Sequence, residues 1–202
     1  MMKKTALSFA GIAALALSAC ATAPGPVEVT RFVAPERAAE LGEGTIFVGT
    51  AVGDDTDSLS LVPYKSAVAA ELAALGYVET QKSDAAQIAT VSIEQYVLAA
   101  NGKRSPVSVG VGGSTGSYGS GVGLGIGVNL GGGPRDQLGT KLSVTIRDAA
   151  SGQSLWEGRA DFRVDDNSPL AQSDAGAQTL AAALFSDFPG NNGETIEVEV
   201  SQ

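Results

Sequence analysis

The sequence predicts a single α+β domain in which two helices pack on one face of an antiparallel or mixed β-sheet. Several segments alternate apolar and polar residues with the period of two that a half-buried strand requires. Two other segments repeat apolar residues every three or four positions, which indicates helices. The expected order is strand, strand, helix, three strands and helix, joined by hairpins rather than by repeated crossovers.

Two strands are expected before the first helix. Residues 27–34 and 45–52 are rich in β-branched and aromatic residues, and the polar stretch 35–44 separates them. The first helix is expected over 61–75, and Gly76 provides a residue that tolerates the left-handed conformation at its end. The apolar stripe of this helix consists of Leu61, Tyr64, Val68, Leu72 and Leu75.

Three further strands are expected at 89–97, 141–147 and 156–164, where apolar and polar residues alternate. The stretch 148–152 has the composition of a hairpin turn. Aromatic residues on the inward face of a strand are far more often packing residues than ligand contacts. The residues expected at the centre of the core are therefore Leu72, Trp156, Phe162 and Leu184.

The second helix is expected to begin at Ser168 and Pro169, which resemble an N-cap followed by proline at the first helical position. An apolar stripe follows, and Pro189-Gly190 ends it. A short last strand is expected at 195–200. The stripe consists of Ala177, Leu180, Ala181, Leu184, Phe185 and Phe188.

The first twenty residues have the features of a bacterial lipoprotein signal. Lys3 and Lys4 supply a positive region, an apolar run covers 6–17, and Leu17-Ser18-Ala19-Cys20 has the form of a lipobox. The apolar run is too short for a transmembrane helix, which needs roughly 20 apolar residues. We therefore expect residues 1–19 to be a signal peptide, and Cys20 to be the lipid attachment site that carries palmitate-type acyl chains.

The residue after the lipobox cysteine bears on localisation. An aspartate there retains many bacterial lipoproteins at the inner membrane, and this chain has Ala21, which favours the outer membrane. Residues 20–27 lack hydrophobic periodicity and are expected to be a lipidated tether. The periplasmic domain would then cover 28–202, with the membrane as a partner through the lipid.

The composition excludes several kinds of chemistry. The chain of 202 residues has no histidine, and its one cysteine would be occupied by the lipid. Serine-histidine, cysteine-histidine and zinc sites are thereby excluded within this chain, and no internal disulfide can form. The formal net charge of −9 disfavours nucleic acid and anionic headgroups. No cofactor is expected apart from the covalent lipid, and an enzymatic role is not favoured.

A glycine-rich insertion occupies residues 102–133 and holds half of the 26 glycines. Apolar residues alternate with glycine or asparagine over 121–130, which is the pattern of a strand with one bare face. Three interpretations of this segment are open: a loose loop, a hairpin that binds a partner or self-associates, and a membrane contact. If the segment is a partner-binding hairpin, the residues expected to contact the partner are Val122, Leu124, Ile126 and Val128.

Two acidic clusters precede the helices. Asp54, Asp55 and Asp57 lie before the first, and Asp165 and Asp166 before the second. Carboxylates can bind divalent cations or perform acid/base hydrolysis, so a hydrolase or a cation-binding domain is the alternative function. The spacing lacks the glycine and distal glutamate of an EF-hand, so solvated loops are the preferred interpretation and no catalytic or metal-binding residue is assigned.

Several segments together resemble a known family. They are the lipobox, the opening strand 27–32, the helix end Leu75-Gly76-Tyr77, the segment Ser83-Asp84-Ala85 before a strand, the long glycine-rich middle, the segment 155–160 and the helix end 185–190. With these segments the chain resembles bacterial envelope lipoproteins of the domain of unknown function 4136 family. The resemblance implies no assigned activity and no catalytic residues. We expect a non-enzymatic, lipid-anchored structural or protein-interaction module, with oligomeric assembly through the glycine-rich hairpin as a further alternative.

Overall fold

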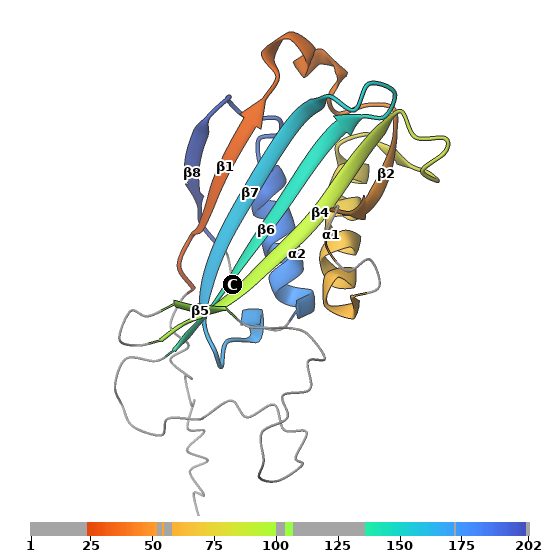
Figure 1. The fold of residues 1–202 in the computed structure, drawn as a ribbon. Coiled ribbons are helices and arrows are strands. Elements are labelled where there is room, and N and C mark those ends of the chain that lie inside the picture. The colour runs from red at the N-terminus through yellow and green to blue at the C-terminus, as the bar shows by residue number, and fades with distance from the viewer. Residues whose placement is uncertain are drawn as a thin grey trace, which may run out of the picture.

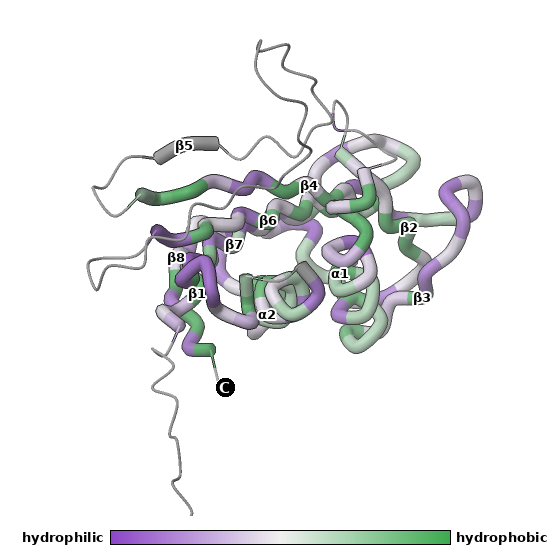
Figure 2. The backbone as a smooth tube through the Cα atoms, turned by 90° about the horizontal axis from the view of Figure 1, so that it is seen from below, coloured by the Kyte–Doolittle hydropathy of each residue, from purple (hydrophilic) through white to green (hydrophobic). Residues whose placement is uncertain are grey.

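The computed structural model of the protein describes residues 24–51, 54, 58–99, 104–106, 136–171 and 173–200. Eight strands form one sheet with the order β3-β2-β4-β6-β7-β1-β8, and β5 pairs with β4 outside this path. The two α-helices lie side by side on one face of the sheet (Figures 1 and 2). The α+β class and the mixed sheet expected from the sequence are confirmed.

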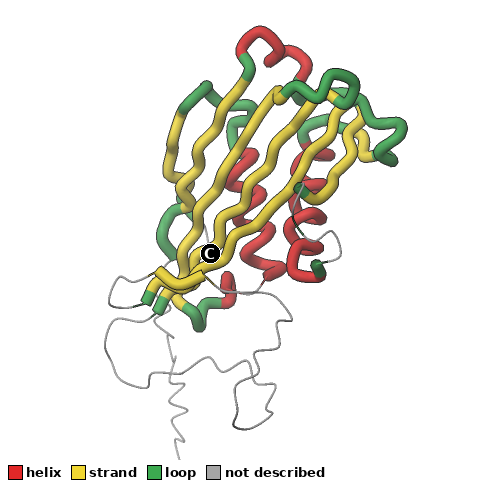
Figure 3. The backbone as a smooth tube through the Cα atoms, in the orientation of Figure 1, coloured by secondary structure: helices red, strands yellow, loops and turns green. Residues whose placement is uncertain are grey.

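Figure 3 distinguishes the helices, strands and loops by colour, and the bounds of the elements are as follows. The strands are β1 (Val27–Val33), β2 (Thr45–Thr50), β3 (Val78–Glu79), β4 (Gln87–Leu98), β5 (Arg104–Pro106), β6 (Gln137–Asp148), β7 (Ser154–Asp165) and β8 (Glu194–Val198). The α-helices are α1 (Val62–Ala74) and α2 (Ser173–Phe185), and the 3-10 helices are η1 (Pro35–Glu40), η2 (Leu59–Leu61) and η3 (Pro169–Ala171). No helix in the described ranges is long and apolar enough to cross a membrane.

Three long antiparallel strands form the centre of the sheet. β4, β6 and β7 each have 12 residues, and β1 adds to β7 in the antiparallel sense. β2 differs because it runs parallel to both β3 and β4, and α1 lies in the connection that leads from β2 to β3 and then to β4. A helical crossover connection therefore accompanies the expected hairpins, since parallel pairs need a long connection.

The core lies between the sheet and the two helices. Inward residues of neighbouring strands stand directly opposite one another, as in the pairs Val29↔Ala160 and Leu142↔Ala160, and all three are 0% exposed. The four predicted core residues are confirmed, since none is more than 2% exposed. Trp156 also stacks on Phe185 with ring centroids 5.3 Å apart, which joins β7 to the end of α2.

The end of α1 agrees with the prediction. Gly76 has a φ of +111°, the N–H of Tyr77 donates to the carbonyl of Leu72 at 3.1 Å, and the N–H of Gly76 donates to the carbonyl of Ala73 at 3.1 Å. This pair of bonds is a Schellman motif, which satisfies carbonyls that the helix leaves free.

The start of α2 differs from the prediction. Ser168 and Pro169 begin the short helix η3, and α2 starts only at Ser173. The Oγ atom of Ser168 accepts the N–H of Leu170 at 3.2 Å, so it caps η3 and not α2. The carbonyl of Leu170 then approaches α2 at Gly176, where an added Cβ would lie 2.7 Å away. The break before α2 allows this close contact.

Two short elements lie where the sequence showed no periodic pattern. The polar stretch 35–44 contains η1, and β3 follows α1 with only two residues. The last strand, expected at 195–200, is observed at 194–198. The glycine-rich insertion lies almost entirely outside the described residues.

Candidate functional site

The face of the sheet opposite the helices carries mostly polar side chains, and no described helix covers it (Figure 2). Residues on this face alternate with the buried residues of the same strands. We call it the open face. Its principal residues are Glu28, Thr30 and Phe32 of β1, Ser92, Glu94 and Tyr96 of β4, Lys141, Ser143 and Thr145 of β6, Glu157, Arg159, Asp161 and Arg163 of β7, and Thr195 and Glu197 of β8.

One charged residue from each of five strands forms a row across the open face. Glu94, Lys141, Asp161, Glu28 and Glu197 stand opposite one another in the register of the sheet. The Nζ atom of Lys141 lies 4.0 Å from Oε2 of Glu94. The last three members are all carboxylates, and like charges directly opposite one another destabilise a sheet. Asp161 has Nε of Arg163 3.4 Å from its Oδ1 atom, so the like charges that face one another directly are Glu28 and Glu197.

A tyrosine cluster lies beside this row. The Tyr96 hydroxyl donates to Oδ1 of Asp161 at 2.8 Å, and Nε of Arg163 donates to the Tyr96 oxygen at 3.0 Å. The ring of Tyr96 lies over Gly139, whose missing side chain makes the space for it. Lys141 places its Nζ atom 5.7 Å from the ring centroid. Tyr96 is only 4% exposed although it belongs to the open face.

The electrostatics of this cluster keep the phenol neutral. Burial is the main cause that raises the pKa of Tyr96, and the Asp161 carboxylate raises it further, whereas Arg163 opposes them. The hydrogen bond to the Tyr96 oxygen raises the pKa of Arg163, with a further contribution from Asp161. Tyr96 is therefore held as a hydrogen-bond donor and does not act as a base near neutral pH.

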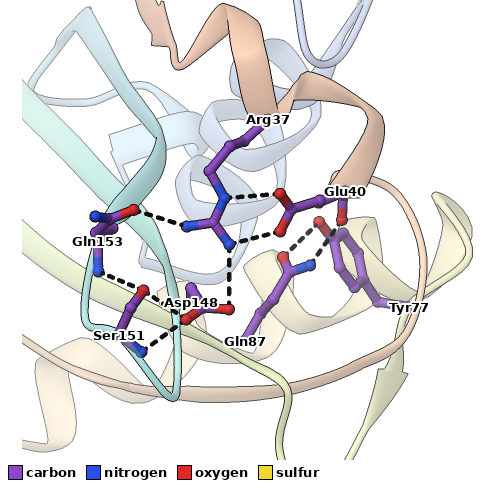
Figure 4. Close-up of polar contacts among 7 residues, drawn as sticks. All are labelled: Arg37, Glu40, Tyr77, Gln87, Asp148, Ser151 and Gln153. Carbon is purple, nitrogen blue, oxygen red and sulfur yellow. Dashed lines mark hydrogen bonds and ion pairs between the residues drawn. The ribbon is translucent and has the colours of Figure 1, made fainter.

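A second polar cluster joins η1 to the turn between β6 and β7 (Figure 4). Arg37 donates from Nε to Oε1 of Glu40 at 2.7 Å and from Nη2 to Oε2 at 2.6 Å. The same guanidinium lies 3.3 Å from Oδ2 of Asp148 and donates to Oε1 of Gln153 at 3.1 Å. Ser151 donates to Oδ1 of Asp148 through its N–H and its hydroxyl. We call these contacts the η1 clamp. We assign them a structural role, because the charged and polar groups form their hydrogen bonds and ion pairs with one another.

Two further residues extend the η1 clamp toward the sheet (Figure 4). Nε2 of Gln87 donates to the carbonyl of Glu40 at 2.7 Å, and the Tyr77 hydroxyl donates to Oε1 of Gln87 at 3.1 Å. The N–H of Gly42 donates to the Tyr77 oxygen at 2.9 Å. Burial raises the pKa of Tyr77, so this phenol also stays neutral.

A buried arginine lies on the helix-covered face. Arg31 is 1% exposed, and its guanidinium donates to the carbonyls of Leu184 and Ala183 and to the hydroxyl of Ser186. A cation at the end of a helix satisfies free carbonyls and complements the helix dipole. Burial lowers the pKa of Arg31, and Asp187 and Glu194 partly oppose this effect. Arg31 is thus a cap for α2, and its place on the inward side of β1 was readable from the alternating pattern of 27–33.

The described acidic residues singled out in the sequence lie in loops and at the end of a strand. Asp54 is exposed in the loop after β2, Asp165 ends β7, and Asp166 is exposed in the following turn. Asp55 and Asp57 lie outside the described residues. Within the described ranges, no group of three or more histidine, cysteine, aspartate or glutamate side chains has an arrangement that could hold a metal ion.

The sequence-predicted lipid and partner sites lie elsewhere. Cys20 and the residues Val122, Leu124, Ile126 and Val128 are outside the described residues, so their expected roles remain predictions. The Tyr96 cluster and the η1 clamp were not foreseen. Each cluster joins segments that are far apart in the chain, β4 with β7 in the first and η1 with the turn after β6 in the second, and no local motif signals these long-range contacts.

The fold and the open face define an α+β domain whose mixed sheet is packed by helices on one side and carries charged side chains on the other. The profile of the family described as Domain of unknown function (DUF4136) matches residues 41–190. The chain belongs to this family, which confirms the family resemblance noted in the sequence.

Similarity to other proteins is limited. An uncharacterized protein of Zymomonas mobilis subsp. mobilis is 34% identical over 64 residues, which is 32% of this chain and 24% of that protein, so the chain spans about a quarter of the length of this curated relative. A PelC dodecamer from Paraburkholderia phytofirmans has 14% identity and a TM-score of 0.43, covering 79% of this chain and 96% of that chain. A PDZ domain protein from Parabacteroides distasonis has 11% identity and a TM-score of 0.49, covering 86% of this chain and 39% of that chain. At these values neither structure informs the function of this chain.

Proposed function

We propose that this protein is a lipid-anchored envelope protein, held in the outer membrane through Cys20, whose periplasmic domain works through protein contacts and not through catalysis. The observation that carries the proposal is the lipobox Leu17-Ser18-Ala19-Cys20 after a charged and then an apolar segment. Two acyl chains or more would hold the domain stably at the membrane, since a single chain binds only weakly.

Two features support the protein-contact part of the proposal. The chain has no histidine and one cysteine, which leaves few of the side chains that usually carry catalysis. The open face presents a charged row with three adjacent carboxylates, which suits a partner with basic side chains. The glycine-rich insertion, through Val122, Leu124, Ile126 and Val128, is the second proposed contact.

The anchor is tested by metabolic labelling with an alkyne fatty acid, followed by fractionation of the envelope. The intact chain should incorporate the label and sediment with the outer membrane. Cys20→Ser should abolish both results, because the acyl acceptor is lost. Thr22→Ser is the matched control and should behave like the intact chain. Labelling that persists in Cys20→Ser would contradict the proposed anchor.

The contacts are tested by affinity capture from the native envelope with three variants. The first variant, Glu28→Lys with Glu197→Lys, reverses two charges of the row. The second is its control, Glu36→Lys with Glu43→Lys, which makes the same charge change on exposed positions away from the open face. The third variant lacks residues 102–133. Loss of a partner with the first pair alone supports the open face. Loss with the deletion alone assigns the contact to the glycine-rich insertion. An unchanged set of partners in all variants would overturn the proposal.

A further inference from the structure

Beyond its short pairing with β3, the strand β2 has an edge that no other described strand pairs with. β3 pairs only with Thr45 and Ile46, whereas β2 continues to Thr50. The carbonyl of Ile46 accepts the N–H of Thr80 on the β3 side. Because backbone groups alternate between the two sides of a strand, Val48 and Thr50 direct their N–H and C=O groups to this same side. No residue in the described part of the chain forms a backbone hydrogen bond with those groups.

A hollow of about 520 Å³ lies beside this edge, between β2 and α1. Val48 lines it from the sheet, and small side chains of one helix face, Ser66, Ala69, Ala70 and Ala73, line it from α1. Its size falls in the range of about 300–1,000 Å³ that is typical of ligand sites. A strand added to β2 would direct alternate side chains into this hollow, where the alanines leave room for a large apolar one.

Opposite charges lie toward the two ends of the hollow. α1 runs antiparallel to β2, so Lys65, in the first turn of α1, lies toward the end of β2. Glu79 stands opposite Ile46, near the beginning of β2. Both side chains line the hollow, and neither forms an ion pair with any described residue. An occupant that complements these charges carries a basic residue near Glu79 and an acidic residue near Lys65.

We propose that an extended segment of a partner protein adds to the edge of β2 as a short strand, with a large apolar side chain in the hollow between two residues of opposite charge. The hydrogen bonds of Val48 and Thr50 supply sequence-independent affinity, and the hollow with Lys65 and Glu79 supplies specificity. Figure 2 shows β2 and β3 at the outer end of the sheet beside α1. The inference rests on the proposed function only in requiring protein contacts, and it needs neither the lipid nor the open face.

The test begins with selection of peptides by the purified full-length protein from a phage-displayed library of random linear dodecapeptides. Enriched peptides should combine a large apolar residue with a basic residue on one side and an acidic residue on the other. On binding, hydrogen exchange of the Val48 and Thr50 amides should slow, because these donors gain partners. Exchange of the Phe47 amide should not change, since it faces β4. Absence of enriched peptides, or unchanged exchange at Val48 and Thr50, would overturn the proposal.

Variants of the hollow and of the β2 edge, together with a matched control, complete the test. Ala70→Phe fills the hollow from an exposed helix position and should weaken peptide binding by about tenfold or more. Ala182→Phe makes the same change on an exposed position of α2 away from the hollow and should bind normally. Val48→Pro removes an outward N–H that β4 does not use and should also weaken binding. Lys65→Glu should change the preferred acidic residue to a basic one.

If Ala70→Phe and Ala182→Phe bind the selected peptides with equal affinity, the hollow is refuted as the binding site. The Cys20→Ser variant separates this inference from the proposed anchor. It should bind the selected peptides as the intact chain does, even where it fails to reach the membrane.

Discussion

Replacement of Arg31 by methionine tests whether a buried cation holds α2 against the sheet. The guanidinium donates to the Leu184 carbonyl at 3.1 Å, the Ala183 carbonyl at 3.2 Å and the Ser186 hydroxyl at 3.0 Å, and the residue is 1% exposed. Arg31→Met keeps much of the apolar stem and removes all three donors. The Leu184 carbonyl then loses its side-chain donor at the buried end of the helix.

The expected loss follows from these three hydrogen bonds. Hydrogen bonds to charged groups contribute about 1.5–3 kcal/mol each, and the variant recovers part of this sum because it no longer buries a charge. The net decrease in the free energy of unfolding should be about 2–4 kcal/mol. For a domain of this size, that decrease corresponds to a fall in Tm of about 4–16 °C.

The measurement is urea and thermal unfolding followed by fluorescence of Trp156, the one tryptophan of the chain. Trp156 is 1% exposed, so its emission should shift to the red when the domain unfolds. Arg159→Met is the matched control, since its side chain is 64% exposed on the open face, and it should change stability by less than about 0.5 kcal/mol. A loss below about 1 kcal/mol for Arg31→Met, similar to that of the control, would refute the assigned capping role.

Two further predictions concern the polar clusters. Gly139→Ala places a Cβ atom where the ring of Tyr96 lies, so the ring must move, and urea unfolding should show a loss of about 1–3 kcal/mol; an unchanged midpoint would argue against this packing. In the η1 clamp, hydrogen bonds from Ser151 lower the pKa of Asp148, and the hydrogen bond from Arg37 lowers that of Glu40. The stability that these two carboxylates contribute is therefore present above the ordinary carboxyl pKa of about 4 and is lost as the pH falls through the lowered pKa values. Asp148→Asn should therefore make the free energy of unfolding fall less steeply with decreasing pH in the acid range. A fall as steep as that of the intact chain would contradict this.

The elements predicted well were those with long periodic patterns. β4, β6 and β7 alternate over most of their length, so burial of one face follows directly from the order of residues. α1 ended as expected because Gly76 takes a positive φ, which an ordinary side chain resists. The core residue Leu184 lay on a stripe with helical spacing and is 0% exposed.

The elements predicted poorly depend on tertiary contacts. Ser168 and Pro169 have the local features of a helix start, yet they begin η3, and α2 starts only after a break that lets the Leu170 carbonyl pack against Gly176. β3 has two residues, too few for any periodicity, and it forms only because α1 returns the chain beside β2. Such arrangements follow from three-dimensional packing and leave no local pattern.

The candidate site was the least predictable part. The Tyr96 hydroxyl meets Asp161, which is 65 positions further along the chain. Its burial requires Gly139 from a third strand. Each of these residues alone is an ordinary strand residue, so only the register of the sheet brings their chemistry together.

The place of β1 within the sheet has a mechanical consequence. β1 is the first strand of the fold, and it lies between β7 and β8, paired with both. A pulling force that enters through the residues before Val27 and acts along β1 loads two hydrogen-bond ladders in shear at once. Tension along β1 in that direction is therefore shared between its pairings with β7 and β8.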